Sequence, residues 1–221
     1  MKRATFLKGI VMIAMFTAFA PFAHADALKS QVELTTKECG SKETALCNLI
    51  ADAIREIADS DIAFVSSSAF NEVSFPKGPV TKEDILKALE FRDDNVIVVK
   101  LTGAQILKAL EHSLYLFPKT NSAFLHFSGI TVEVKPEAEK GKRVVSVKLD
   151  DKLLENGKSY KVAMPSPLAK GALAYSKIWK SSKEDKDTDK TLETAILDYL
   201  KKKTLIEKSD ERLILPKKKT E

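Results

Sequence analysis

Near the start of the chain, apolar side chains recur first at helical spacing and then at strand spacing. Residues 43–58 carry an apolar stripe at intervals of three and four, which predicts an amphipathic helix. Residues 61–66 form a short apolar run, which predicts a strand that is buried on both faces. Because this run ends in three serines at 66–68, we expect the strand to stop at a turn or to open on a ligand pocket.

Two capping boxes mark the helices that follow. The string "TKED" at 81–84 predicts a short helix that reaches about residue 89, and "TGAQ" at 102–105 predicts a helix that runs to about residue 114. Between them, "NVIVVKL" at 95–101 predicts a strand. Helix and strand signals therefore alternate over the first half of the chain.

The second half is richer in strand signals. Four β-type runs are separated by glycine-containing turns and lie at 123–129, 130–135, 143–150 and 158–164. The remaining segments are a predicted helix near 168–179, a charged loop over 181–190, an amphipathic helix over 190–203 and an apolar stretch at 212–216. The chain has no internal repeat and no Gly/Ser linker, so we expect one domain of mixed α/β (α+β) class over residues 26–221.

The first 25 residues have the pattern of a secretory signal peptide. Three basic residues precede an apolar run over 9–22, and "AHA" at 23–25 is a cleavage site of the small-x-small type. We therefore expect cleavage after Ala25 and a periplasmic or secreted mature chain. A membrane anchor is the alternative, but it needs about 20 apolar residues, and Pro21 interrupts a shorter run. We expect no membrane span after cleavage.

The formal net charge of +5 depends partly on this leader. Residues 1–25 hold three basic and no acidic residues, so the mature chain carries 5 − 3 = +2. Its charges are interleaved except in the lysine runs 201–203 and 217–219, which have no aromatic residues interleaved with them. Such short runs are typical of solvated helix ends and tails, so we expect no nucleic-acid partner.

The mature chain has two cysteines, Cys39 and Cys47. Because an exported chain folds in an oxidising compartment, one interpretation is a disulfide between them. On the chain-entropy model such a short bridge contributes about 2–3 kcal/mol. The alternative is that Cys47 is a small buried residue on a helix face and Cys39 is a free loop thiol. The sequence does not distinguish the two.

Motifs of the common hydrolases are missing. His112 and His126 are the only histidines after the leader, and the chain has no H-E-x-x-H, C-x-x-C, D-x-H or G-N-H string. It also has no glycine-rich phosphate loop and no G-x-S-x-G elbow. We therefore expect no catalytic residues, no metal ligands and no cofactor, and we interpret both histidines as hydrogen-bonded structural residues.

The order of several strings is nevertheless typical of one family. The strings are "ETALCNLIADAIREIADSDIAFV", "LTGAQILKALEHS" and "FLHFSGITVEV". With them the chain resembles the C-terminal, substrate-binding domain of the 5'-nucleotidase family, which includes periplasmic UDP-sugar hydrolases and ecto-5'-nucleotidases. The resemblance covers about residues 34–215 and implies a four-layer α/β/β/α fold. The metallophosphoesterase domain of that family has no counterpart in this sequence, in agreement with the missing metal motifs.

The resemblance also implies a base-binding site made of two aromatic rings. In the family, a nucleobase lies between two rings. The string "LEFRDDN" puts Phe91 at the first position and "GALAY" puts Tyr175, by a looser match, at the second. Base–aromatic stacking contributes about 1–3 kcal/mol per base and tolerates different bases. The alternative is structural, with Phe91 packing at a helix end and Tyr175 covering a helix face.

Phosphate recognition is expected to be degraded. Where the family has N-G-G-G-I-R, Ser66 stands at the asparagine, Ser68 at a glycine and Asn71 at the arginine, and Gly40 stands at a second family arginine. The chain therefore lacks two guanidinium groups that bind phosphate through paired hydrogen bonds. The serine side chains also obstruct the close backbone approach that glycine allows.

Lys42 and Arg92 lie near Gly40 and Asn71 in the sequence and are candidate replacements for the lost arginines.

Three functions follow as hypotheses. The first hypothesis is an exported, non-catalytic module that binds a nucleoside or nucleotide with degraded phosphate recognition. The second is the substrate-binding subunit of a split 5'-nucleotidase, with a separate metallophosphoesterase chain as its partner. The third is a protein-interaction domain without a ligand.

Overall fold

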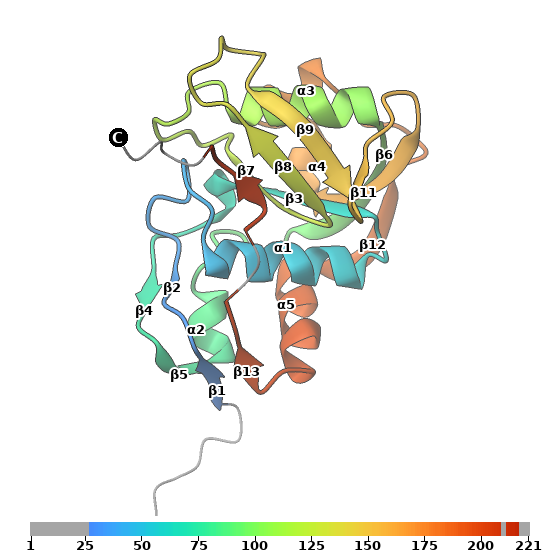
Figure 1. The fold of residues 1–221 in the computed structure, drawn as a ribbon. Helices are drawn as coiled ribbons and strands as arrows, with labels where there is room; N and C mark the ends of the chain where they lie inside the picture. Colours follow the sequence, from blue (N-terminus) through green and yellow to red (C-terminus); the bar gives the residue numbers. More distant parts are fainter. Residues whose placement is uncertain (1–26, 209–210, 217–221) are drawn as a thin grey trace, which may run out of the picture.

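A computed structural model describes residues 27–208 and 211–216, and its centre is a five-stranded mixed sheet of order β12-β6-β11-β3-β7 (Figure 1). The predicted signal peptide lies outside the described residues. Strand β11 pairs in parallel with β3 and antiparallel with β6. The strands are β3 (Ile62–Ser66), β6 (Asn95–Thr102), β7 (Leu125–Ser128), β11 (Ser159–Pro165) and β12 (Lys186–Thr191).

A second sheet has four strands in the order β10-β9-β8-β14. Its strands are β8 (Ile130–Val134), β9 (Val144–Leu149), β10 (Lys152–Leu153) and β14 (Leu213–Ile214). Two smaller sheets contain β1 (Ala27–Ser30) between β13 (Leu205–Ile206) and β5 (Gly78–Thr81), and β2 (Leu34–Thr35) beside β4 (Ser74–Phe75).

Threonines cap four of the helices. The side chains of Thr44, Thr81, Thr102 and Thr191 each accept a hydrogen bond from a backbone N–H of the first turn, which satisfies a donor that the helix itself cannot pair. The helices are α1 (Ala45–Ile57), α2 (Lys82–Leu86), α3 (Gly103–Ser113), α4 (Ser166–Ala169) and α5 (Leu192–Lys201), with 3₁₀ turns η1 (Ser67–Ala69) and η2 (Tyr175–Lys177).

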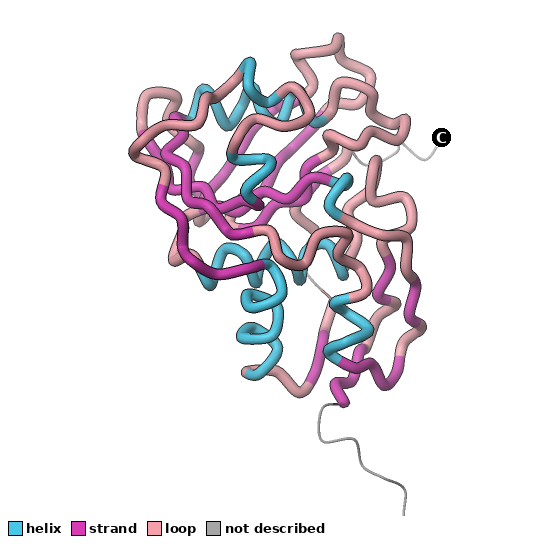
Figure 2. Tube along the Cα trace, turned by 180° about the vertical axis from the view of Figure 1, so that it is seen from behind, coloured by secondary structure: helices cyan, strands magenta, loops and turns pink. Residues whose placement is uncertain are grey.

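The central sheet has an apolar core on each face. Helices α1, α2 and α5 pack on the face that carries Ala63 and Val65. Helix α3 and the four-stranded sheet cover the opposite face, which carries Ile62 and Phe64. From top to bottom, Figure 1 shows α3, the β8/β9 sheet, the sheet with β3, and then α1 and α5. The same layers are visible from behind in Figure 2. The predicted mixed α/β class is confirmed, and the layers follow the expected α/β/β/α order.

The predicted helix near 168–179 is wrong. The chain makes one short turn of helix, α4, and then a 3₁₀ turn, η2. Between them Gly171, Leu173 and Ala174 have φ of +87°, +56° and +68°. Helical φ is negative, so these left-handed residues break the helix that the apolar spacing suggested.

The expected loop over 181–190 is also partly wrong. Its second half is strand β12, which pairs antiparallel with β6 at the edge of the central sheet. The Thr188 hydroxyl donates to the Val96 carbonyl at 2.8 Å across this pair. Charged side chains suit an exposed edge strand, and this position explains why the segment has no apolar alternation. The helices and strands predicted over 43–58, 61–66, 95–101 and 190–203 are confirmed.

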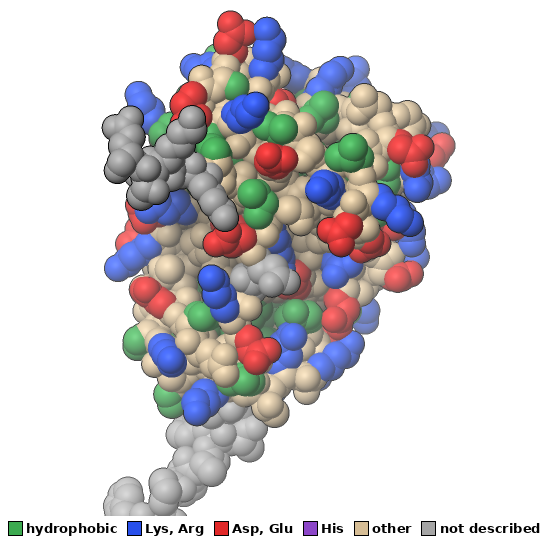
Figure 3. All heavy atoms as spheres, in the orientation of Figure 1, with side chains coloured by type: hydrophobic (Ala, Val, Ile, Leu, Met, Phe, Trp, Pro, Cys, Tyr) green, Lys and Arg blue, Asp and Glu red, His purple; other side chains and the backbone are tan. Residues whose placement is uncertain are grey.

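None of the helices in the described part of the chain has the length and apolarity needed to cross a bilayer. On the face shown in Figure 3, basic and acidic side chains are interleaved over the whole surface.

Candidate functional site

The three serines after β3 form a tight turn. Ser66 and Ser67 are buried, and the Ser66 and Ser68 hydroxyls lie 2.9 Å apart, within hydrogen-bond distance. The backbone N–H of Ser67 donates to the Phe124 carbonyl at 2.8 Å, and its hydroxyl donates to the Asn121 carbonyl at 2.7 Å. Strand β3 therefore ends in a turn that is hydrogen-bonded to residues 121–124.

The loop then runs beside the end of α2. The backbone N–H of Asn71 donates to the Ala88 carbonyl, and that of Glu90 donates to the Ala69 carbonyl, both at 2.9 Å. The Asn71 side-chain amide donates to the Leu89 carbonyl at 3.0 Å. This pairing places the segment before Phe91 next to the serine turn, while Asn71 uses its side chain for structure.

The structure does not bring the two predicted stacking rings together as an open slot. Phe91 is 57% exposed, whereas Tyr175 is fully buried. The Tyr175 ring is stacked on Trp179 with 4.8 Å between ring centroids, and it meets His112 edge-on at 4.7 Å. In this conformation Tyr175 presents no face to a ligand. Whether Phe91 or Tyr175 stacks on a base stays a prediction.

Tyr175 and the serine turn share one support. The Tyr175 hydroxyl donates to the Ala123 carbonyl at 2.7 Å, and Ser67 donates to Asn121 and Phe124 of the same segment. Burial raises the pKa of the Tyr175 hydroxyl well above its usual value, so the hydroxyl remains a donor. Residues 121–124 thus connect two of the predicted site positions.

The two candidate replacements for the lost arginines are already paired. Arg92 lies 2.9 Å from the Glu83 carboxylate, and Lys42 lies 2.7 Å from that of Glu38. A side chain at Gly40 would also meet an obstacle, because its Cβ would lie 2.6 Å from the Cγ2 atom of Thr120. Neither Lys42 nor Arg92 is therefore an unpaired replacement for the family arginines at Gly40 and Asn71.

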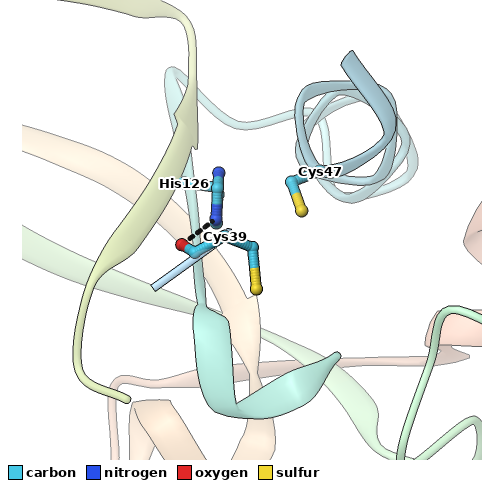
Figure 4. Close-up of side chains that lie close together, drawn as sticks. All are labelled: Cys39, Cys47 and His126. Carbon is cyan, nitrogen blue, oxygen red and sulfur yellow. Dashed lines mark hydrogen bonds between the residues drawn. The ribbon is translucent and has the colours of Figure 1, made fainter. Parts of the chain in front are cut away.

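A separate cluster of side chains lies beside the serine turn, where the Cys39 sulfur is 4.0 Å from the Ser67 carbonyl oxygen. Cys39, Cys47 and His126 bring two sulfur atoms and a ring nitrogen within 4.8 Å of one another (Figure 4). The two sulfurs are not bonded, so the disulfide stays a prediction. No sequence motif groups His126 with the cysteines, because 79 residues separate it from Cys47 (126 − 47 = 79).

The two thiols differ electrostatically. A hydrogen bond with the Cys47 thiol and, to a lesser extent, the nearby His126 lower the pKa of the Cys39 thiol to about 5, against the opposing effect of burial. Burial raises the pKa of the Cys47 thiol well above its usual value. Cys39 is also the more exposed of the two. It is therefore the thiol from which a proton is lost first.

A cavity of about 530 Å³ opens at the start of α1, where Lys42, Glu43, Asn48 and Leu213 contribute to its lining. Among the residues predicted to bind a base or phosphate, only Lys42 lines it, and neither Phe91 nor the serine turn does. A ligand at the predicted positions would therefore bind on the exposed surface around Phe91.

Comparison with known proteins identifies the family. Residues 21–178, more than half of the 221 residues, match the family model described as 5'-nucleotidase, C-terminal domain. An apyrase of Aedes albopictus is 27% identical over 161 residues, which are 67% of this chain and 28% of the apyrase. A snake venom 5'-nucleotidase of Macrovipera lebetinus is 30% identical over 190 residues, which are 76% of this chain and 46% of that protein.

Solved structures show the same fold. The 5'-nucleotidase precursor of Thermus thermophilus matches with a TM-score of 0.76 and 25% identity, over 86% of this chain and 39% of that one. The NAD nucleotidase of Haemophilus influenzae has a TM-score of 0.71 at 18% identity, which shows the fold alone. The chain spans less than half the length of each of these four relatives. It belongs to the family of 5'-nucleotidase C-terminal domains.

Proposed function

We propose that this chain is an exported, non-catalytic module that binds the base and sugar of a nucleoside or nucleotide without specific phosphate recognition. The observation that carries the proposal is the exposed ring of Phe91, 57% accessible, beside a turn of serine hydroxyls. An aromatic face offers stacking to any base, and the hydroxyl of Ser68, the exposed serine of the turn, can accept from or donate to a sugar. The predicted signal peptide supports export.

The charges near the site support weak phosphate recognition. Arg92 and Lys42 each have a carboxylate partner, so a phosphate would have to compete for them. The Lys42 pair is solvent-exposed and individually weak, and an ammonium group lacks the paired donors that make arginine–phosphate contacts strong. The Arg92 guanidinium has such donors, but one of its nitrogens is already bonded to Glu83. Adenosine and AMP are therefore expected to bind with similar affinity.

Calorimetric titration tests this function. We expect adenosine and AMP to bind with dissociation constants within about threefold of each other. Phe91→Ala should weaken both by roughly 5- to 150-fold, because one stacking contact contributes about 1–3 kcal/mol. Tyr115→Ala, which removes another half-exposed ring, is the matched control and should leave binding unchanged. The proposal fails if Phe91→Ala binds as tightly as wild type, or if neither ligand binds.

A second candidate is the substrate-binding part of a nucleotidase whose catalytic residues lie outside these 221 residues. Two relatives favour it, a snake venom 5'-nucleotidase and an apyrase. This chain matches 46% of the length of the first and 28% of the length of the second. Phosphate release from AMP, measured with and without a separately expressed metallophosphoesterase chain, distinguishes the two. A rate that rises on addition of this chain supports the second candidate, and an unchanged rate supports the first.

A further inference from the structure

Three potential metal ligands converge from three separate segments. Cys39 lies in the turn before α1, Cys47 in the first turn of α1 and His126 in β7. Their two sulfur atoms and a ring nitrogen lie within 4.8 Å of one another (Figure 4). Cys47 and His126 are buried and Cys39 is half-buried. Because His126 is far from both cysteines in the chain, the tertiary fold creates this cluster.

Packing alone does not account for the histidine. Its Nε2 lies 2.9 Å from the Cys39 carbonyl, and because a carbonyl only accepts, Nε2 is the donor. The other nitrogen, Nδ1, is buried and has no hydrogen-bond partner among the described residues. The ring lies edge-on to Phe70 and Phe124. A buried polar group with an unpaired atom in aromatic surroundings calls for an explanation such as a bound water or ion.

We propose that Cys39, Cys47 and His126 form a binding site for one thiophilic d¹⁰ metal ion, Zn²⁺ or Cu⁺. Thiolate and imidazole are the ligands that these ions prefer, whereas Ca²⁺ and Mg²⁺ prefer oxygen. Metal–ligand bonds of about 2.0–2.3 Å place the ligand atoms roughly 3.3–3.8 Å apart. Atoms that already lie within 4.8 Å of one another need shifts of about 1 Å to reach that geometry.

The burial of the three protein ligands limits which further ligand the ion can bind. Three protein ligands complete a trigonal Cu⁺ site, whereas Zn²⁺ usually takes four ligands and would add a water. Of the three ligands, Cys39 alone is partly exposed, so that water would enter beside Cys39. Both thiols bind as thiolates and the imidazole through an unprotonated nitrogen, and the displaced protons pass to the solvent.

A bound ion would connect three segments of the domain beside the serine turn. It would tie the turn before α1 to α1 and to β7, and the Cys39 sulfur lies 4.0 Å from the Ser67 carbonyl. The site is independent of nucleoside binding, since none of its three ligands is one of the predicted ligand-contacting residues. It excludes a Cys39–Cys47 disulfide, because both sulfurs cannot be oxidised together and coordinate as thiolates.

Metal content and thiol protection test the proposal in the full-length mature chain. Protein purified without added metal is reduced, stripped with a chelator, incubated with one equivalent of Zn²⁺ or Cu⁺ and desalted. We expect about one ion per chain in the wild type and in His112→Gln, a matched control at the other histidine. In Cys39→Ser and His126→Gln the affinity should fall by more than about 100-fold, since changes outside the ligand set alone cost about 10–100-fold.

A second measurement needs no variant. In the loaded wild-type chain both thiols should resist alkylation, and a chelator should restore their reaction. The arm in which one ion per chain is retained identifies Zn²⁺ or Cu⁺. The proposal is overturned if the reduced chain retains neither ion, or if Cys39→Ser retains it undiminished. It is also overturned if the isolated chain has thiols that only a disulfide reductant, and not a chelator, exposes.

Discussion

The Tyr175 hydroxyl donates a hydrogen bond of 2.7 Å to the Ala123 carbonyl inside the core. Ala123 lies in the segment 121–124, to which Ser67 also donates from its backbone and hydroxyl. Tyr175 therefore supports the serine turn indirectly, through residues 121–124. A role in base stacking would require its ring to leave the contact with Trp179.

Tyr175→Phe tests this supporting role. The substitution keeps the ring but leaves the Ala123 carbonyl buried without its partner, which costs about 1–3 kcal/mol. We expect the free energy of unfolding in urea to fall by that amount. Tyr115→Phe is the control, because Tyr115 is 50% exposed and surface changes stay within about 0.5 kcal/mol. Equal urea midpoints for Tyr175→Phe and wild type would show that the bond contributes nothing.

Arg212 connects the C-terminal segment to the core. Its guanidinium donates to both Asp52 carboxylate oxygens, at 2.9 and 2.7 Å, and to the Phe127 carbonyl at 2.9 Å. The two charged side chains are only 15% and 23% exposed. Arg212→Met leaves the Asp52 charge largely buried without its cation. Such losses cost about 3–5 kcal/mol for a fully buried pair, so we expect about 2–3 kcal/mol here by urea unfolding.

A surface pair provides the comparison for Arg212. Lys201 lies 2.7 Å from Asp198, but the two side chains are 66% and 39% exposed. Lys201→Met should change the free energy of unfolding by less than about 0.5 kcal/mol. If the free energy of unfolding falls by the same small amount in both methionine variants, the Arg212–Asp52 pair does not stabilise the fold more than a surface pair does.

The sequence predicts those parts of the fold that local patterns control. The apolar stripe of α1 and the capping boxes at Thr81 and Thr102 have their signals within a few residues, and the structure contains all three elements. The order of motifs also predicts the family. The helix prediction for segment 168–179 was wrong because helical apolar spacing carries no information about the left-handed residues that interrupt the segment.

The candidate site depends more on distant contacts. Stacking on Trp179 and the hydrogen bond to Ala123 bury Tyr175, and neither contact follows from the string "GALAY". The convergence of His126 with Cys39 and Cys47 likewise depends on how β7 packs beside α1. The sequence therefore indicates candidate residues for the site, but the exposure and the contact partners of these residues depend on the tertiary structure.

Acid should remove a stabilising contact at α2. Hydrogen bonds from Lys87 and Thr81 lower the pKa of Asp84 from 3.8 to about 2 in the folded chain. Because the folded-state value is depressed, the contribution is complete above about pH 4 and is lost as the pH falls through about 2. Asp84→Ala should therefore cost about 1 kcal/mol near pH 6, and this deficit should shrink between pH 4 and pH 2. Urea unfolding at several pH values measures it.

The second capping box supplies a control that does not titrate. In α3 the residue equivalent to Asp84 is Gln105, whose side chain accepts a hydrogen bond from the Thr102 backbone at 2.9 Å. Gln105→Ala also removes a hydrogen bond to the Ile178 carbonyl, so its loss of stability should be at least as large, but this loss should stay constant over the same pH range. A parallel change in both variants would mean that Asp84 ionisation is not the cause.

Gly129 and Gly141 separate backbone strain from steric exclusion. Both have left-handed backbone, with φ of +88° and +83°. A Cβ at Gly129 would lie 2.2 Å from the Asp61 carbonyl oxygen, whereas one at Gly141 would meet nothing within 4 Å. Gly141→Ala should therefore lose about 1–2 kcal/mol from strain alone. Gly129→Ala should lose clearly more, because β7 or the Asp61 backbone must shift as well. If both variants lose the same free energy of unfolding in urea, the backbone around Asp61 shifts at little cost. Close packing would then not explain the glycine in the "FSGI" string.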